Sequence, residues 1–346
     1  MKKPDSIRRV VVIGASAGGV EAVSSLAARF PPDLDAAVFV VLHIPHNATS
    51  YMPQILSRAG RLRAIHPTGS MPMERGVIYV APPDKHLLVE GDHVTIVSGP
   101  RENGHRPAVD PLFRSAADSW RNRVIGVVLS GNLDDGTAGL AAIKACGGIA
   151  LVQSPEETLF PGMPMSAIEN VAVDHVLPLA EIVPTIVRLI DGGEPSEEPS
   201  MKDQDMELEV RNAQLDSSLA DTDAHVGSPS GFSCPECSGV LWEVEDGKLV
   251  RYRCRVGHAY SAESLLSASS SAVEAALWAS LRSLEENAAF ARRLSRRATV
   301  MEQHEVSERF VAQADRASAH AVTIRNVLLS GPVAAQPRPE RLIAPE

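Results

Sequence analysis

Three short stretches carry side chains of the kind that hydrolytic enzymes use, and each follows an apolar run. Residues 14–18 read GASAG, the pattern G-x-S-x-G, in which glycines permit a sharp turn that presents the Ser16 hydroxyl. His43 ends a second apolar run, and Asp134 and Asp135 lie a few residues beyond a third. A serine, a base and an orienting carboxylate form a nucleophilic relay. The pattern therefore predicts acyl transfer at Ser16, while one aspartate could simply cap the helix that follows.

Other interpretations of this stretch stay open. A Gly-rich turn after a strand can hold a phosphate, as in a nucleotide-binding domain, but G-x-G-x-x-G would need glycine at position 16. An ordinary α/β-hydrolase order would pair Ser16 and Asp135 with His175. His43 is preferred because His175 runs straight into another apolar segment. A non-catalytic, zinc-containing signalling adaptor is the remaining alternative.

A parallel sheet is the element that would position these residues. Continuous β-branched runs over residues 9–14, 37–42, 77–80, 124–129 and 149–152 indicate strands buried on both faces. Helical patterns lie between them, and runs at 87–89 and 94–97 flank a turn typical of a hairpin. The alternation predicts a doubly wound, mostly parallel α/β sheet with helices on both faces over residues 1–190. Sites in such sheets lie at the carboxyl ends of the strands.

A second cluster of reactive side chains lies near the carboxyl end. Cys234 and Cys237 form one pair, Cys254 and His258 form another, and 16 residues with a hairpin pattern separate them. This spacing predicts a closed, tetrahedral Cys₃His site for a structural zinc ion in a knuckle over residues 231–261. A redox pair or a disulfide is the alternative. No cofactor is expected for catalysis.

The segments around this knuckle differ in composition. Residues 191–230 hold 11 acidic residues against two basic ones and no aromatic residue, which predicts an acidic flexible linker. Residues 262–330 contain neither Gly nor Pro and repeat apolar residues every three to four positions. They predict an antiparallel helical pair turning near residues 303–307, which either packs on itself or self-associates as a coiled coil. Residues 331–346 are read as a tail.

Composition limits the classes of partner. The chain has 346 residues, 44% of them apolar and 22% charged, with a net charge of −10. No apolar run reaches the roughly 20 residues that span a bilayer, and no signal peptide is recognisable, so a cytoplasmic protein without direct membrane insertion is expected. Arg251, Arg253 and Arg255 alternate along one predicted strand. A solvated strand face is favoured over a nucleic-acid surface because the chain is acidic, so no nucleic-acid partner is expected.

Residues 8–190 resemble the catalytic domain of the CheB-type chemotaxis protein-glutamate methylesterases. The matching stretches occur in the family's order; they are residues 12–19, 41–45, 79–87, 105–113, 129–136 and 162–164. The resemblance implies that Ser16 is the nucleophile, His43 the general base and acid, and Asp135, rather than Asp134, the orienting carboxylate. It also implies hydrolysis of glutamate γ-methyl esters with release of methanol, and glutamine deamidation, on a methylated chemoreceptor or a similar helical signalling protein.

The resemblance also directs attention to the surroundings of the relay. The backbone around Ala17 and Asn132 is expected to hold the oxyanion, although the family usually has threonine and methionine at these positions. His105 and Arg106 are expected to line the cleft, with ordinary loop hydrogen bonding as the alternative. Members usually carry an N-terminal receiver domain, whereas the matching sequence here starts almost at Met1. Control through such a domain is therefore not expected of this chain.

Overall fold

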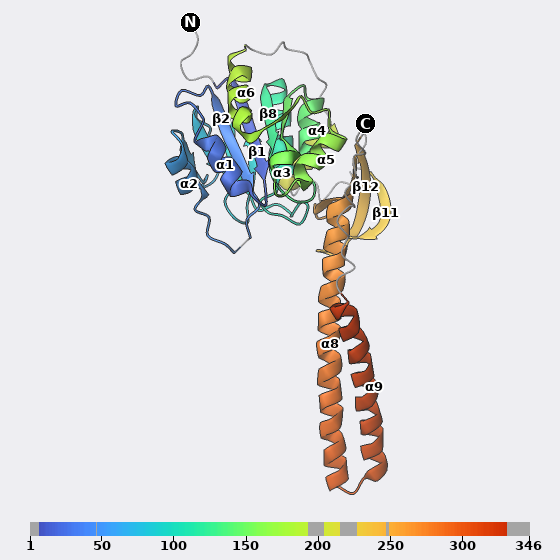
Figure 1. Cartoon of the computed structure of the whole chain (residues 1–346). Coiled ribbons are helices and arrows are strands. Elements are labelled where there is room, and N and C mark those ends of the chain that lie inside the picture. Colours follow the sequence, from blue (N-terminus) through green and yellow to red (C-terminus); the bar gives the residue numbers. More distant parts are fainter. Residues whose placement is uncertain (1–6, 46, 193–203, 215–226, 247–248, 331–346) are drawn as a thin grey trace, which may run out of the picture. The chain divides into compact units, whose positions relative to one another are not determined.

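The computed structural model describes residues 7–45, 47–192, 204–214, 227–246 and 249–330. The chain divides into two compact units, Met1–Ser264 and Leu265–Glu346. Figure 1 shows the elements coloured along the sequence, from blue at the N-terminus to red at the C-terminus. Within the ranges that the structure describes, no helix combines the length and the hydropathy needed to cross a bilayer.

A seven-stranded sheet lies at the centre of the first unit, and all its neighbouring strands are parallel. Its strands are β1 (Arg9–Ala15), β2 (Ala36–Leu42), β3 (Arg63–Ile65), β5 (Val77–Val80), β8 (Val124–Val128), β9 (Ile149–Gln153) and β10 (His175–Leu177). From edge to edge their order is β10, β9, β8, β1, β2, β5, β3. The predicted parallel sheet is confirmed, and the three-residue edge strands β3 and β10 extend it.

Helices cover both faces of this sheet. They are α1 (Gly19–Ala27), α2 (Met52–Ala59), α3 (Val109–Trp120), α4 (Thr137–Ala145), α5 (Gly162–Asn170) and α6 (Leu179–Asp191). In β1, Val10 and Val12 belong to the apolar cluster that includes residues of α3, α4 and α5, whereas Val11 and Ile13 belong to the cluster that includes residues of α1, α2 and α6. Because successive strand side chains point to opposite faces, a continuous apolar run fills both layers. This explains why the strands were recognisable as unbroken apolar runs.

Smaller elements complete the part of the first unit that precedes residue 193. A three-stranded sheet contains the predicted hairpin, β6 (His86–Glu90) and β7 (His93–Val97), with β4 (Met71–Pro72) on its edge. Two short 3-10 helices are η1 (Arg121–Arg123) and η2 (Pro155–Glu157).

The prediction of a flexible acidic linker over residues 191–230 is wrong for part of its length. Residues 204–213 form the helix α7 (Gln204–Ala213), which packs near α3, and β11 (Ser228–Ser233) begins inside the same range. Glu209 on α7 is 3% exposed. At least one acidic residue of this segment, Glu209, is therefore a buried carboxylate with arginine partners rather than part of a solvated linker. Residues 193–203 and 215–226 lie outside the described residues.

The predicted metal-ligand segment belongs to the first compact unit. It folds as an antiparallel sheet of β11, β12 (Val240–Asp246), β13 (Leu249–Cys254) and β14 (Ala259–Ser261). We call residues 227–261 the ribbon. The sequence predicted residues 231–261 as a separate domain, whereas the boundary between the compact units lies after this segment, at Ser264.

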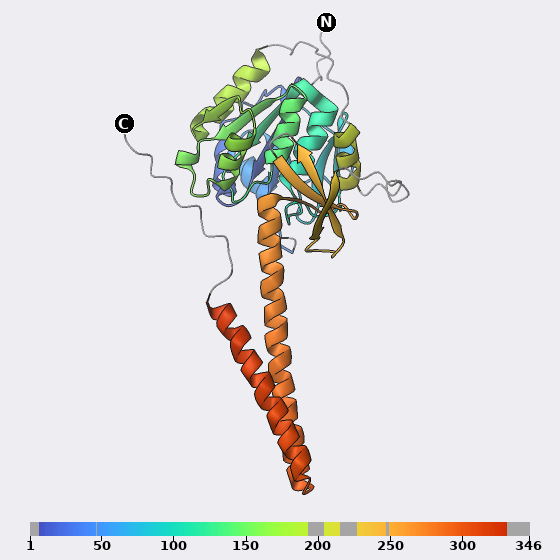
Figure 2. The same ribbon diagram turned by 90° about the vertical axis from the view of Figure 1, so that its right-hand side faces the viewer.

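The second unit consists of an antiparallel helical pair, as predicted. Its helices are α8 (Ala262–Val300), whose first turn belongs to the first unit, and α9 (His304–Leu329). The two helices lie side by side in Figure 2, joined by hydrogen bonds from Arg292 to Ser318 and between Ser295 and Ser307. Alanines fill the seam between them: Ala288, Ala291, Ala298, Ala314, Ala317 and Ala321 are buried. The turn lies at residues 301–303, slightly before the predicted position, and the predicted tail lies outside the described residues.

Candidate active site

Three adjacent strands place the predicted relay at one edge of the sheet. Ser16 directly follows β1, His43 directly follows β2, and Asp135 lies between β8 and α4. Since β8, β1 and β2 are neighbours and parallel, their carboxyl ends meet at the same edge. His175 instead begins β10, at the amino end of a strand. The structure therefore brings His43, and not His175, to Ser16.

The side chains of the relay form a continuous chain of hydrogen bonds. His43 Nδ1 lies 3.1 Å from Ser16 Oγ, and His43 Nε2 lies 2.6 Å from Asp135 Oδ2. A carboxylate can only accept, so the neutral imidazole donates its Nε2–H to Asp135 and accepts the serine hydroxyl at Nδ1. The side chains of His43 and Asp135 are 6% and 2% exposed. This geometry matches what a serine nucleophile and its base require.

The carboxylate of Asp135 is held from several sides. Its Oδ2 accepts the Val109 N–H at 2.7 Å, and its Oδ1 accepts the Asp110 N–H at 3.2 Å and Asn103 Nδ2 at 3.0 Å. Burial by itself would raise the pKa of Asp135, but the hydrogen bonds from His43 and Val109 and the charge of a protonated His43 outweigh it and lower the pKa. Asp135 is therefore ionised, as its predicted orienting role requires.

The turn that carries Ser16 is fixed by the loop after β8. The Ser16 N–H donates to the Ser130 carbonyl at 2.9 Å, and Ser130 Oγ donates to the Ala17 carbonyl at 2.8 Å. A Cβ on Gly131 would lie 2.8 Å from Ser16 Cβ, so this backbone passes directly beside Ser16. Ala17 is half-buried and Asn132 is exposed on the same two loops. Their role at an oxyanion stays a prediction.

His105 and Arg106 both line a cavity next to the relay. The cavity measures about 290 Å³ and is lined by His43, Ile44, Pro45, Arg101, Gly104, His105 and Arg106. The His105 ring stacks on the His43 ring with centroids 3.7 Å apart. Arg106 is anchored by Asp84 at 2.7 Å and by the Gly99 carbonyl at 2.7 Å. Burial, and then the proximity of His43, lower the pKa of His105 to about 4.

Sequence reasoning missed Asn103, which joins two buried carboxyl groups. Its Nδ2 donates to Asp135 Oδ1 and to Asp110 Oδ2, both at 3.0 Å, and its Oδ1 accepts the Ser261 N–H and the Ser264 hydroxyl, both at 2.9 Å. Asn103 has a φ of 52°, which asparagine tolerates better than most residues. The pair Asn103-Gly104 indicated only a loop, because all four partners are distant or buried in other elements.

Asp134 and Asp110 take other roles than the relay. Asp134 accepts the Ser261 hydroxyl at 2.7 Å, and burial raises its pKa to about 6. Asp110 accepts the N–H groups of Gly136 and Gly139 at 3.1 and 2.7 Å. Burial, and then the charge of Asp135, raise the pKa of Asp110 to about 8. The preference for Asp135 over Asp134 agrees with these positions.

The prediction of a solvated strand face is wrong for Arg251 and Arg253 on β13, whereas Arg255, just after the strand, is exposed. Arg253 is 7% exposed and lies 3.1 Å from Glu102 and 3.2 Å from Glu209. Arg251 pairs with Glu209 at 2.7 Å, and Arg114 on α3 pairs with both glutamates. These five side chains form a buried ionic network between the ribbon, α7 and α3. The predicted absence of a nucleic-acid partner stays a prediction.

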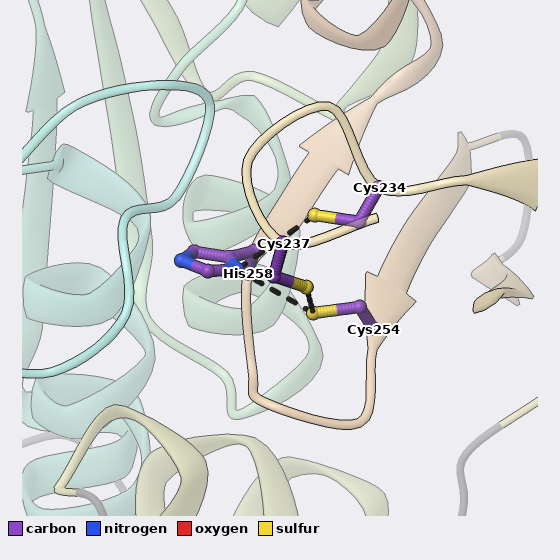
Figure 3. Close-up of side chains that lie close together, drawn as sticks. All are labelled: Cys234, Cys237, Cys254 and His258. Atoms are coloured by element: carbon purple, nitrogen blue, oxygen red, sulfur yellow. Dashed lines mark hydrogen bonds between the residues drawn. The ribbon is translucent and has the colours of Figure 1, made fainter. Parts of the chain in front are cut away.

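The four predicted metal ligands also come together. The ligand atoms of Cys234, Cys237, Cys254 and His258 all lie within 4.8 Å of one another, and no disulfide joins them. Figure 3 shows the four side chains converging from two turns of the ribbon. Among the described residues, no other group of His, Cys, Asp and Glu side chains brings its ligand atoms together in this way. The bound metal itself stays a prediction.

Comparison with known proteins agrees with this geometry. The family model described as CheB methylesterase matches residues 11–186. A relative from Leptospira interrogans, provisionally named a protein-glutamate methylesterase/protein-glutamine glutaminase, is 37% identical over 52% of this chain and 93% of its own length. A protein-glutamate methylesterase/protein-glutamine glutaminase of Methanosarcina mazei is 35% identical over 55% of this chain, which spans about half (54%) of that protein.

A solved structure gives the same result. The crystal structure of the Thermotoga maritima CheB methylesterase catalytic domain is 30% identical, with a TM-score of 0.50, and the match covers 52% of this chain and 98% of that one. Ser16, His43 and Asp135 all lie within the region matched by the family model. On these matches, the chain belongs to the CheB methylesterase family.

Proposed function

We propose that this chain is a serine hydrolase that removes methyl groups from glutamate γ-carboxyl esters of chemoreceptor-type helical proteins. The observation that carries the proposal is the hydrogen-bonded series from Ser16 through His43 to Asp135 in a CheB methylesterase domain. Relatives named protein-glutamate methylesterase/protein-glutamine glutaminase support this substrate class.

The first half of the proposed reaction transfers the acyl group to Ser16. As Ser16 Oγ attacks the ester carbonyl, its proton passes to His43 Nδ1, 3.1 Å away. Ionised Asp135 stabilises the imidazolium through Nε2–H, and backbone N–H groups around Ala17 and Asn132 are the proposed donors to the oxyanion. The intermediate collapses, the C–O bond to the methoxy group breaks, and His43 returns its proton to the departing methanol.

The second half frees the enzyme. A water molecule gives a proton to His43 and attacks the acyl group on Ser16; the bond to Ser16 Oγ breaks, and His43 protonates the serine. The products are a glutamate carboxylate and the original Ser16 hydroxyl. A glutamine amide would follow the same steps with ammonia as the leaving group, which accounts for the proposed deamidation.

The decisive test is methanol release from a methyl-esterified chemoreceptor fragment. Ser16→Ala should lower the rate by roughly 10³-fold or more, since loss of the nucleophile disables the whole relay. Ser24→Ala is a matched control because its hydroxyl bonds only to the Val20 carbonyl on its own helix. Methanol release that survives in Ser16→Ala would overturn the proposal.

The same assay distinguishes the two histidines. His43→Ala should abolish methanol release, whereas His175→Ala should leave it unchanged because His175 begins a strand at the other end of the sheet. The opposite result would favour the ordinary α/β-hydrolase relay. Full inactivity of the unmodified chain toward esters and amides would instead favour a non-catalytic adaptor.

A further inference from the structure

The arrangement of Cys234, Cys237, Cys254 and His258 has the dimensions of a tetrahedral metal site. With Zn–S near 2.3 Å and Zn–N near 2.0 Å, the edges of a regular tetrahedron are about 3.8 Å between sulfurs and about 3.5 Å between sulfur and nitrogen. Cys237 and Cys254 Sγ lie 3.6 Å apart, and His258 Nδ1 lies 3.5 Å from Cys254 Sγ and 3.7 Å from Cys234 Sγ. A disulfide would need sulfurs at about 2.05 Å.

Tight turns and a carboxylate hold these ligands in place. The Ser238 N–H donates to the Cys234 carbonyl in the first turn, and the Gly257 N–H donates to the Cys254 carbonyl in the second. His258 Nε2 lies 3.2 Å from Glu236 Oε2. A carboxylate on the far nitrogen leaves Nδ1 free for a metal, as is usual for metal-binding histidines. Figure 3 shows the imidazole placed among the sulfurs.

The second pair of ligands leads directly into the strand that contacts the loop at residues 101–103. His258 is followed by β14, where the Ala259 N–H donates to the Arg101 carbonyl at 3.3 Å and the Ala259 carbonyl accepts the Asn103 N–H at 2.7 Å. Two residues later, Ser261 N–H donates to Asn103 Oδ1. Ser261, whose N–H bonds the Asn103 side chain, thus lies three positions after the ligand His258.

Arg253, the residue before the ligand Cys254, also contacts the loop at residues 101–103. Arg253, adjacent to Cys254, pairs with Glu102, adjacent to Asn103, and also donates to the Gly257 carbonyl at 2.9 Å. Glu102 is 1% exposed, so this ion pair is shielded from water. The ribbon therefore holds residues 102 and 103 through both a backbone ladder and a buried charge.

Asn103 uses its full hydrogen-bonding capacity between the ribbon and the relay. Its two Nδ2 hydrogens go to Asp110 and Asp135, and its Oδ1 accepts from Ser261 and Ser264. A carboxamide rotated by half a turn would point its oxygen at two carboxyl groups. The donors from Ser261 and Ser264 therefore select the orientation in which Asn103 donates to Asp135.

From these contacts we propose that Cys234, Cys237, Cys254 and His258 bind one Zn²⁺, and that this ion fixes the ribbon so that Asn103 positions Asp135. The second half rests on the proposed function, in which Asp135 orients His43. Asn103 is a positioning residue, since it acts through Asp135. The zinc is structural, because four protein ligands leave no open coordination position.

The metal is tested on the full chain without any assay of activity. The purified chain should contain one zinc ion, and Co²⁺ exchanged for it should give the visible absorption of a tetrahedral thiolate site. Cys237→Ala should lose both signals. Cys146→Ala is the matched control, because Cys146 is a buried cysteine at the end of α4, outside the cluster. A metal-free chain that binds neither ion, or equal binding by Cys237→Ala, would overturn the metal site.

The link to the relay is tested by proton NMR of the His43 N–H that donates to Asp135. This hydrogen bond is 2.6 Å long, so its proton should resonate far downfield and vanish in His43→Gln. Removal of zinc should shift or broaden the signal, Asn103→Ala should do the same, and removal of zinc from Asn103→Ala should add nothing further. Ser270→Ala, with a hydroxyl bonded within its own helix, should leave it unchanged.

Kinetics supply the second readout. Zinc removal and Asn103→Ala should each lower kcat for ester hydrolysis by about tenfold to a hundredfold with little change in KM, and the two effects should not multiply. An identical NMR signal with and without zinc, or effects that multiply, would overturn the link. If no ester is hydrolysed but the NMR signal responds to zinc, the proposed function fails while the metal-dependent positioning stands.

Discussion

At the scale of residues, Asp135 and Asp110 show how their surroundings decide which of two neighbouring carboxyl groups is ionised. Both are buried and both accept a hydrogen bond from Asn103 Nδ2. Asp135 has a lowered pKa because it also bonds His43, whereas burial beside Asp135 raises the pKa of Asp110 to about 8. Near neutral pH the pair therefore carries a single negative charge, and that charge lies on the group that faces His43.

His105 links the relay to acid stability. Its pKa in the folded chain is lowered to about 4 from the ordinary 6.5, so folding excludes a proton. The associated stability is fully present above pH 6.5 and is lost as the pH falls toward 4. The variant His105→Phe keeps a ring against His43 but cannot take up this proton. From pH 7 to pH 4.5, its free energy of unfolding should fall by roughly 2 kcal/mol less than that of the unmodified chain.

Urea unfolding at the two pH values measures this difference. The groups facing His105 are His43, Asp135 and Arg101, all of which the variant retains. His93→Phe is the control, because that histidine lies on an exposed part of β7. Equal acid loss in His105→Phe and in the unmodified chain would show that His105 does not govern this transition.

Gly131 allows Ser16, the proposed nucleophile, to take its position because glycine has no side chain. A Cβ there would lie 2.1 Å from Met163 Sδ and 2.8 Å from Ser16 Cβ, so one of these groups must move. A displacement of about 1 Å at a nucleophile can cost about 10²-fold in rate, and we expect a loss of that order in Gly131→Ala. Methanol release measures it. Gly69→Ala, where a Cβ meets nothing within 4 Å, should behave like the unmodified chain.

At the scale of elements, the periodicity of apolar residues predicted the strands, whose pattern lies within a single element. It missed α7 and Asn103, whose positions depend on contacts with several elements. Apolar runs indicated the strands because both faces of the sheet are covered, and residues placed after β1, β2 and β8 could be expected at one edge. The helix α7 could not be predicted, because Glu209 is buried only with the help of arginines more than 40 residues away on β13 and on α3. Asn103 was missed for the same reason.

The burial of Glu209 gives a prediction for the stability of this interface. Glu209 pairs with Arg114, Arg251 and Arg253, and its pKa is lowered because these charges outweigh the cost of burial. Glu209→Ala leaves buried arginines with fewer partners and should lower the free energy of unfolding by about 3–5 kcal/mol. Urea denaturation measures the loss. Glu207→Ala, an exposed acidic position on the same helix, should change little; a similar loss in both would exclude the ionic network as the cause.

At the scale of the whole molecule, the contacts of the relay extend well beyond the segment that defines the family. The family model ends at residue 186, yet Asn103 and Asp134 bond to Ser261, and Glu102 bonds to Arg253. Sequence distances of about 130 to 160 residues separate these partners, so no local pattern could reveal them. The first compact unit therefore includes the ribbon, and a fragment that stops at the family boundary loses two of the four hydrogen bonds of the Asn103 side chain.

Truncation separates these contributions. A chain ending at residue 271 keeps the relay, α7, the ribbon and the first turns of α8, and every hydrogen bond to Asn103 described above comes from residues up to Ser264. Its kcat on a small methyl ester should equal that of the full chain. A chain ending at residue 192 should have a lower kcat, because Glu102 loses Arg253 and the Asn103 side chain loses Ser261 and Ser264. Circular dichroism verifies that each fragment is folded. Equal kcat in both fragments would show that the ribbon does not support the relay, and loss of kcat in the longer one would assign a catalytic contribution to the helical pair.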